Sequence, residues 1–130
     1  MSYSRRAVLS LALAACVAGG LAMAGEHSSF APAAFEAAQK AGKPILVEVT
    51  APWCPTCRAQ APILKELSAE PKFKNLQVFA VDFDNQKDAL QMFKAQRQST
   101  LIVFKGASEV GRSVGDTDKA SIEALLAKSL

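Results

Sequence analysis

The chain contains few of the residues from which protein metal sites are built. Its 130 residues include 3 Cys and 1 His, and the first cysteine, Cys16, lies in an apolar N-terminal segment. The remaining ligands, Cys54, Cys57 and His27, fall short of the four that a structural zinc site normally needs. The sequence therefore argues against a metal site within one chain.

The chain also has no large excess of positive or negative charge. Basic residues number 15 and acidic residues 12, and two of the basic ones, Arg5 and Arg6, belong to the N-terminal segment. The nearly neutral remainder argues against a protein that binds the phosphates of nucleic acids. A composition that is 50% hydrophobic with only 7 Gly and 6 Pro excludes disordered and fibrous chains.

The first 24 residues have the layout of a secretory signal peptide. A cationic start, residues 1–6, is followed by apolar residues 7–24, which end in Ala22-Met23-Ala24. This pattern predicts cleavage after Ala24 and one domain over residues 25–130. The alternative is an uncleaved membrane anchor, because about 20 apolar residues can span a bilayer.

Two details of this segment bear on the export route. Arg5-Arg6 resembles a twin-arginine signal, although ordinary leaders also carry paired arginines. Leu13-Ala14-Ala15-Cys16 resembles a lipoprotein signal, in which Cys16 would be lipidated and would hold the protein at the membrane. The alternative, which the cleavage site after Ala24 favours, is that Cys16 is simply a small apolar residue of the leader. In every case the domain is expected outside the cytoplasm, in the periplasm, where disulfides persist.

Hydrophobic periodicity predicts a single α/β domain. The expected elements are a helix over residues 33–41 preceded by a start signal at Ser28 and Ser29, a strand over 45–50, a helix over 54–69, a strand over 76–83, a helix capped by Asp84 or Asn85, strands over 100–104 and 109–115, and a last helix capped by Asp116 or Thr117. This order predicts a central mixed sheet of about four strands with helices on both faces.

Cys54 and Cys57 lie where a strand ends and a helix begins. A helix N-terminus presents unpaired N–H groups and a partial positive charge, which stabilise a thiolate. In a Cys-x-x-Cys frame such cysteines have lowered pKa values, so Cys54 is expected to attack disulfides. Cys57, one turn later and expected to be less exposed, would resolve the mixed disulfide. Pro55 and Thr56 would tune the thiolate.

Two other interpretations of this pair stay open. A structural disulfide is disfavoured, because closing so short a loop removes little chain entropy. Binding of a metal or an iron–sulfur cluster would need ligands from a second chain. A non-enzymatic metal-binding or partner-binding module is therefore the competing hypothesis.

Several segments together resemble the thioredoxin superfamily. They include Ile45-Leu46-Val47-Glu48, Ala51-Pro52-Trp53-Cys54-Pro55-Thr56-Cys57-Arg58, Ala61-Pro62-Ile63-Leu64, Val81-Asp82-Phe83-Asp84 and Thr100-Leu101-Ile102-Val103-Phe104. The resemblance implies a thioredoxin fold, a redox-active Cys54–Cys57 disulfide, and Trp53 in the substrate groove. Glu48 matches a buried aspartate of the family and would take the proton of Cys57, since a carboxyl buried there would have a raised pKa. The alternative for Glu48 is an ordinary solvent-facing glutamate. The family's nearby lysine is replaced by Ala80.

Ser99 departs from the family pattern. Thioredoxin-like proteins place a cis-proline before the third strand, whereas no proline follows Pro71 here. Because a cis peptide at a residue other than proline costs about 2.5–4 kcal/mol, a trans peptide is expected at Ser99. The resemblance therefore supports docking of substrate along the backbone of Gln98 and Ser99 less strongly than it supports the cysteine chemistry. Loss of the proline also gives the metal alternative more weight than the ligand count alone, although it stays the minor one.

The resulting hypothesis is a thiol–disulfide oxidoreductase, a protein-disulfide reductase by resemblance, that exchanges disulfides with extracytoplasmic proteins. No organic cofactor is implied. The direction of electron flow depends on the reduction potential of the pair and on its partners, of which a membrane electron donor or oxidant is the expected one. Membrane contact is expected only if Cys16 is lipidated or the leader is retained.

Overall fold

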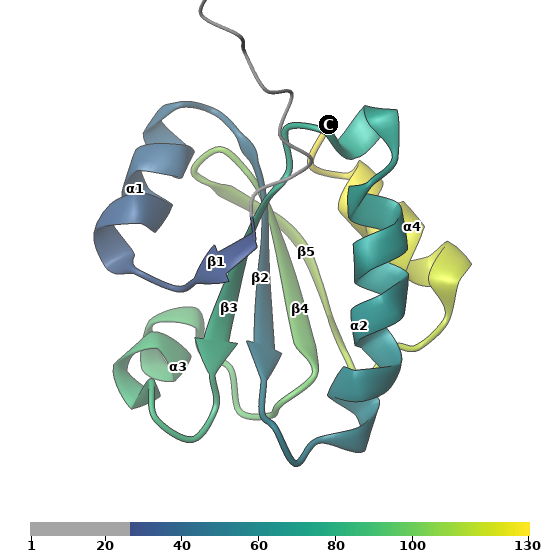
Figure 1. Ribbon diagram of the computed structural model, residues 1–130. Coiled ribbons are helices and arrows are strands. Elements are labelled where there is room, and N and C mark those ends of the chain that lie inside the picture. Colours follow the sequence, from purple (N-terminus) through teal and green to yellow (C-terminus); the bar gives the residue numbers. More distant parts are fainter. Residues whose placement is uncertain (1–26) are drawn as a thin grey trace, which may run out of the picture.

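A computed structural model describes residues 27–130 (Figure 1). In chain order its elements are β1 His27–Ser29, α1 Pro32–Lys40, β2 Pro44–Thr50, α2 Pro55–Ser68, the 3₁₀ helix η1 Pro71–Phe73, β3 Gln77–Asp82, α3 Lys87–Phe93, β4 Thr100–Lys105, β5 Ser108–Val114 and α4 Lys119–Ala127. The predictions for residues 1–26, including the signal peptide, Arg5-Arg6 and Cys16, lie outside the described residues. Within residues 27–130, no helix has the length and apolar character that a membrane crossing would require.

The strands form one mixed sheet in the order β1-β3-β2-β4-β5. β1 and β2 each pair in parallel with β3, whereas β4 is antiparallel to both β2 and β5. Parallel neighbours need crossover helices, and α1 and α2 supply the two crossovers around β2. The carboxyl ends of β2 and β3 consequently lie together at the lower edge in Figure 1, where α2 begins.

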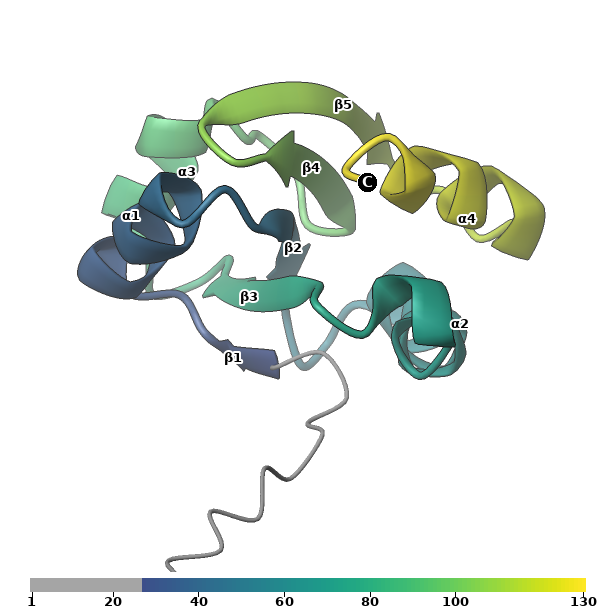
Figure 2. The same ribbon diagram turned by 90° about the horizontal axis from the view of Figure 1, so that it is seen from above.

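Helices cover both faces of the sheet, α1 and α3 on one side and α2 and α4 on the other (Figure 2). Alternate residues of β2 separate accordingly, because successive strand side chains point to opposite faces. Val47 packs with α1 and α3, and Leu46 packs with α2 and α4. The core on the side of α1 and α3 contains a cluster of phenylalanines with edge-on ring pairs, namely Phe30, Phe35, Phe79, Phe93 and Phe104.

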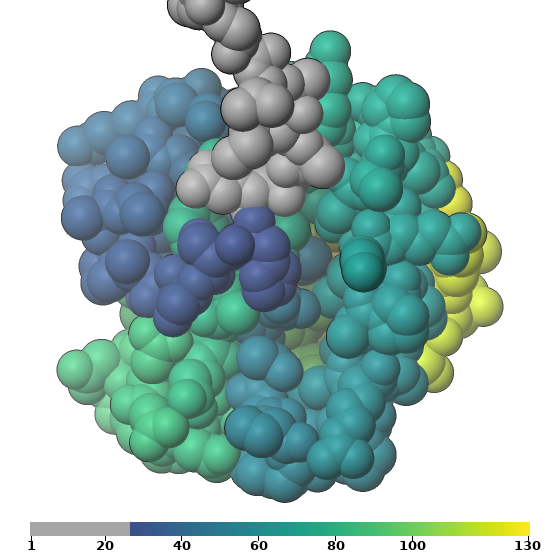
Figure 3. All heavy atoms as spheres, in the orientation of Figure 1, coloured from purple at the N-terminus to yellow at the C-terminus, as the bar shows by residue number. Residues whose placement is uncertain are grey.

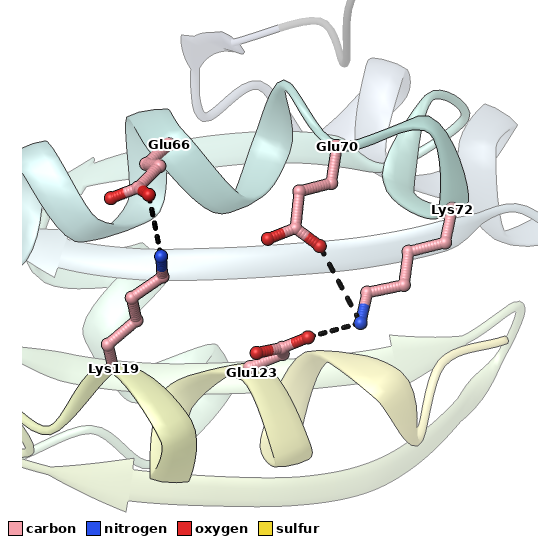
Figure 4. A network of polar contacts seen from close by, with 5 residues as sticks. All are labelled: Glu66, Glu70, Lys72, Lys119 and Glu123. Atoms are coloured by element: carbon pink, nitrogen blue, oxygen red, sulfur yellow. Dashed lines mark hydrogen bonds and ion pairs between the residues drawn. The ribbon is translucent and has the colours of Figure 1, made fainter.

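The second face is also held by ion pairs between the α2 side and α4 (Figure 4). Lys119 lies 2.6 Å from Glu66, and Lys72 pairs with Glu123 and, at 3.6 Å, with Glu70. The hydrogen bond from Lys72 holds the pKa of the Glu123 carboxyl below its usual range, and the same contact raises the pKa of Lys72. These pairs are exposed, so apolar packing beneath them carries most of the stability.

The predicted fold is confirmed, with five strands instead of about four. Ser28 and Ser29 were expected to start the first helix, but they lie in the edge strand β1, and α1 begins after Ala31. A three-residue strand is too short to show a periodicity, which is why the sequence pattern missed it. The expected caps of the last two helices were also wrong by one or two residues: Gln86 precedes α3, and Asp118 caps α4 by accepting from the Ser121 N–H.

Candidate active site

Cys54 is the N-cap residue of α2, and its sulfur accepts a hydrogen bond of 3.1 Å from the Cys57 N–H. The two sulfurs form a disulfide, with Cα atoms 5.3 Å apart. Pro55 starts the helix, where its missing N–H costs nothing. The geometry therefore directs the helix N-terminus at the Cys54 sulfur, which is the arrangement that stabilises a thiolate.

The prediction that Cys57 is less exposed than Cys54 is wrong for the disulfide form described here. Cys54 is 0% exposed and Cys57 is 8% exposed. Cys54 turns inward because its sulfur caps the helix and packs with Ala51 and the partly buried Phe83. Cys57 instead borders a surface pocket with Pro52 and Arg58. Exposure in the disulfide form therefore does not identify which of the two cysteines attacks.

Exposed side chains flank the disulfide on one side. Trp53 is 51% exposed, and its indole N–H donates to Asp84 at 2.9 Å. Its ring packs edge-on against Phe83. Pro55 is exposed and Thr56 is half-buried. Asp84 had been expected as a helix cap, and its actual contact fixes the orientation of an apolar surface beside the cysteines.

The loop before β4 is held against the end of β2. No peptide bond in residues 27–130 is cis, so the bond before Ser99 is trans, as expected. Ser99 has a left-handed backbone, with φ of +59°, and its N–H donates to the Val49 carbonyl at 2.7 Å. The same carbonyl oxygen lies 3.8 Å from the Cys57 sulfur, within reach of a weak S–H···O bond after reduction. The Gln98 carbonyl accepts from the Ser99 hydroxyl at 2.6 Å.

Gln60, which no motif in the sequence singles out, connects this loop to the active-site helix. The residue is only 3% exposed, and its side-chain amide donates to the carbonyls of Ser99 at 3.2 Å and Asp116 at 2.9 Å. The available signal was its spacing: with Cys57, Leu64 and Leu67, it forms the buried face of α2. A polar residue on an otherwise apolar helix face needs a buried partner.

Glu48 lies on β2, and its side chain is 16% exposed. It lines a pocket that also contains Ala61, and Ala61 in turn borders the pocket of Cys57. A Glu48 oxygen lies 2.5 Å from Nε2 of His27. Ala80 is its β3 neighbour in register. Glu48 is thus neither fully buried nor freely solvated, and its partner is His27, which the sequence alone suggests only as a metal ligand.

Within residues 27–130, no group of three or more His, Cys, Asp or Glu side chains is arranged to hold a metal ion. Any metal on Cys54 and Cys57 would therefore need ligands from outside the described part of the chain.

Comparison with known proteins settles the family. The thioredoxin family model matches residues 27–128. The chain belongs to the thioredoxin family. Among its relatives, a thioredoxin of Alicyclobacillus acidocaldarius subsp. acidocaldarius is 36% identical over 96 residues, which cover 74% of this chain and 90% of the relative. A thioredoxin H-type of Fagopyrum esculentum is 36% identical over 81 residues, covering 62% and 68% of the two chains.

A solved structure is similar over most of the domain. The crystal structure of Trxlp from Edwardsiella tarda EIB202 has 44% sequence identity and a TM-score of 0.76, and the match covers 78% of this chain and 98% of that one. Thioredoxins are disulfide oxidoreductases that act on protein thiols and disulfides. This thioredoxin is accordingly a thiol–disulfide oxidoreductase with a Cys-x-x-Cys pair, of the protein-disulfide reductase type.

Proposed function

We propose that this thioredoxin is exported and exchanges disulfides with extracytoplasmic proteins, with Cys54 as the attacking and Cys57 as the resolving cysteine. The observation that supports the assignment of roles is the position of Cys54 at the N-cap of α2, where its sulfur accepts the Cys57 N–H. A negative charge on Cys54 gains most from the helix terminus, because the effect of the helix dipole falls off within the first turn.

In the reducing direction, the Cys54 thiolate attacks one sulfur of a substrate disulfide. A bond forms between Cys54 and that sulfur, and the other substrate sulfur leaves as a thiolate and takes up a proton. Cys57 then loses its proton and attacks the Cys54 sulfur. This step forms the Cys54–Cys57 disulfide and releases the second substrate thiol, so two electrons pass from the protein to the substrate.

Glu48 is the proposed acceptor of the Cys57 proton. It lies on the side of the sheet that α2 covers, one residue from Val49, whose carbonyl is next to the Cys57 sulfur. A thiol is a poor nucleophile until it is deprotonated, so a carboxylate at this position would accelerate the resolving step. The proposed docking surface for substrate comprises Trp53, Pro55, Thr56 and the loop at Gln98 and Ser99.

Export is supported by the leader-like residues 1–24 and by the absence of charge between residues 7 and 24. In an oxidising compartment, repeated reduction of substrates needs an external source of electrons, and a membrane disulfide carrier is the proposed donor.

Trapping of mixed disulfides tests the assignment of the cysteines. Incubation of Cys57→Ser with a disulfide-containing protein should accumulate covalent complexes that dithiothreitol releases. Cys54→Ser, the matched control, should form almost none and should have no reductase activity. Complexes that accumulate on Cys54→Ser instead would reverse the roles.

A fusion tests export separately. Residues 1–30 joined to a reporter that is active only outside the cytoplasm should give activity. Cys16→Ser tests for a lipid anchor, because it removes the cysteine that would be lipidated. Arg5→Lys with Arg6→Lys tests the twin-arginine route, because it removes the paired arginines. An inactive fusion would refute the proposed export and leave the redox chemistry untouched.

A further inference from the structure

His27 reaches across the edge of the sheet to the proposed proton acceptor. Its Nε2 atom lies 2.5 Å from Oε1 of Glu48, although the two residues are separated by 21 positions in the chain. The His27 side chain is 62% exposed, whereas that of Glu48 is 16% exposed. One ring nitrogen therefore contacts a largely covered carboxylate while the ring itself stays in contact with solvent.

The register of the sheet explains how this contact forms. β3 lies between β1 and β2, with His27 beside Val78 and with Glu48 beside Ala80. The ring must pass over β3 to reach Glu48, and Ala80 offers only a methyl group at that point. Beyond the ring lies a pocket of about 470 Å³ between β1 and α2, visible as a hollow in Figure 3.

The other charged groups around the pair are few. Lys65 of α2 lines the same pocket. Across Ala61, the adjoining pocket contains Cys57, Arg58 and Asp82. Among the groups that line Glu48's own pocket, His27 is the one whose side-chain type titrates between about pH 5 and 8.

Imidazole and carboxylate differ in base strength in a way that matters for a thiol. A carboxylate is ordinarily about two pKa units weaker as a base than an imidazole, and it is far weaker than a thiolate. A lone carboxylate is consequently a poor match for a thiol proton, since general bases work best when their affinity for the proton is close to that required. Passing the proton on to an imidazole corrects much of this mismatch.

We propose that His27 is the final proton acceptor of the resolving step: Glu48 takes the proton from the Cys57 thiol and passes it to His27, which releases it to water. This inference rests on the proposed role of Glu48. In the balanced step the Cys57 thiolate attacks the Cys54 sulfur, the substrate thiolate leaves, and the Cys57 proton ends on the imidazole. His27 acts through Glu48 and touches no reacting sulfur.

Reaction of the reduced protein with 5,5′-dithiobis(2-nitrobenzoate) separates the two chemical steps. Release of the first thionitrobenzoate reports the attack by Cys54, and release of the second reports the attack by Cys57. The assay uses the 130-residue chain, so that no amino terminus adjoins His27. Stopped-flow traces from about pH 5 to 9 then give the rate of each step as a function of pH.

The second phase of the unaltered protein should show an inflection with pH that depends on the imidazole of His27. His27→Gln keeps a side-chain amide near Glu48 but cannot take a proton. Its second phase should be slower by about tenfold above pH 7 and should lack the inflection. The first phase should be unchanged. Added imidazole should restore the second phase of His27→Ala.

Lys65→Gln is the control for a general charge effect, and it should keep the inflection. If Lys65→Gln also loses the inflection, or if His27→Gln keeps the rate and profile of the unaltered protein, the assignment of His27 is wrong. Glu48→Gln distinguishes this failure from failure of the proposed function. A second phase that is slow in Glu48→Gln but normal in His27→Gln overturns the His27 step alone, whereas normal rates in both overturn the relay itself.

Discussion

Replacement of Ser99 by proline would restore the residue type that thioredoxin-like proteins carry at this position, and the structure predicts that it is destabilising. The φ angle of Ser99 is +59°, about 125° from the value of about −65° that the proline ring imposes. Proline also lacks the N–H that Ser99 donates to the Val49 carbonyl at 2.7 Å. The loop therefore cannot accept the ring without moving.

The loss in free energy of unfolding can be estimated from the hydrogen bonds that Ser99 makes. A buried carbonyl deprived of its donor costs about 1–3 kcal/mol, and each further bond is worth about 0.5–1.5 kcal/mol. Rotation of residue 99 also disturbs the two bonds that its carbonyl accepts, from Gln60 and Gly115. Together these give a loss of about 2–6 kcal/mol, a large share of the roughly 5–15 kcal/mol that stabilises a small domain.

Urea unfolding with the Cys54–Cys57 disulfide intact measures this loss. Ser99→Gly is the matched control, because glycine adopts positive φ without strain and keeps the backbone N–H. Relief of about 1–2 kcal/mol of left-handed strain should roughly offset loss of the hydroxyl bond to Gln98. We expect Ser99→Gly to unfold near the unaltered protein and Ser99→Pro at a much lower urea concentration. A proline variant as stable as the unaltered protein would refute the reasoning.

Three further predictions address the relay, the ion pairs and metal binding. Glu48→Gln should slow release of the mixed disulfide by about 10- to 100-fold, which is at most the smallest effect usual for removal of a general base, and it should leave the initial attack by Cys54 intact. Equal slowing of both steps in stopped-flow traces would contradict the relay. Because the pKa of Glu123 is lowered in the folded protein, its ion pair with Lys72 should stabilise the fold above the usual glutamate pKa of about 4.3 and lose this effect as the pH falls further. Glu123→Gln should therefore lower the melting temperature slightly at pH 7 but not at pH 2.5, and an equal decrease at both values would contradict the assignment. If the reduced protein binds a metal ion, the metal should elute with a dimer in size-exclusion chromatography, since Cys54 and Cys57 supply only two ligands; a metal-loaded monomer would contradict this ligand count.

Periodicity and turn residues were sufficient to predict the layers of the fold. The apolar run over Ile45–Val49 and the hairpin over residues 100–115 both became strands at the expected places. The short strand β1 was missed because pairing with β3 holds its three residues, whose own sequence, His27-Ser28-Ser29, has little strand propensity. Tertiary pairing of this kind leaves no periodic pattern in the sequence.

The sequence was sufficient to predict the part of the site whose reactive residues are close neighbours in the chain, namely Cys54 and Cys57. The contacts of Gln60, Asp84 and His27 were not predictable, because each joins segments more than 20 residues apart. The inward turn of Cys54 was missed for another reason. A capping cysteine directs its sulfur toward the helix N–H groups, and this local bond takes precedence over exposure in the disulfide state.

The central claim, that the N-terminus of α2 makes Cys54 the nucleophile of this thioredoxin, is tested most directly by competitive alkylation. The reduced protein is treated with iodoacetamide at less than one equivalent at pH 7, and the modified cysteine is located by mass spectrometry of peptides. A thiolate stabilised at the helix terminus should direct nearly all of the label to Cys54, despite its burial in the disulfide form. Preferential labelling of Cys57, or equal labelling of both, would contradict the account.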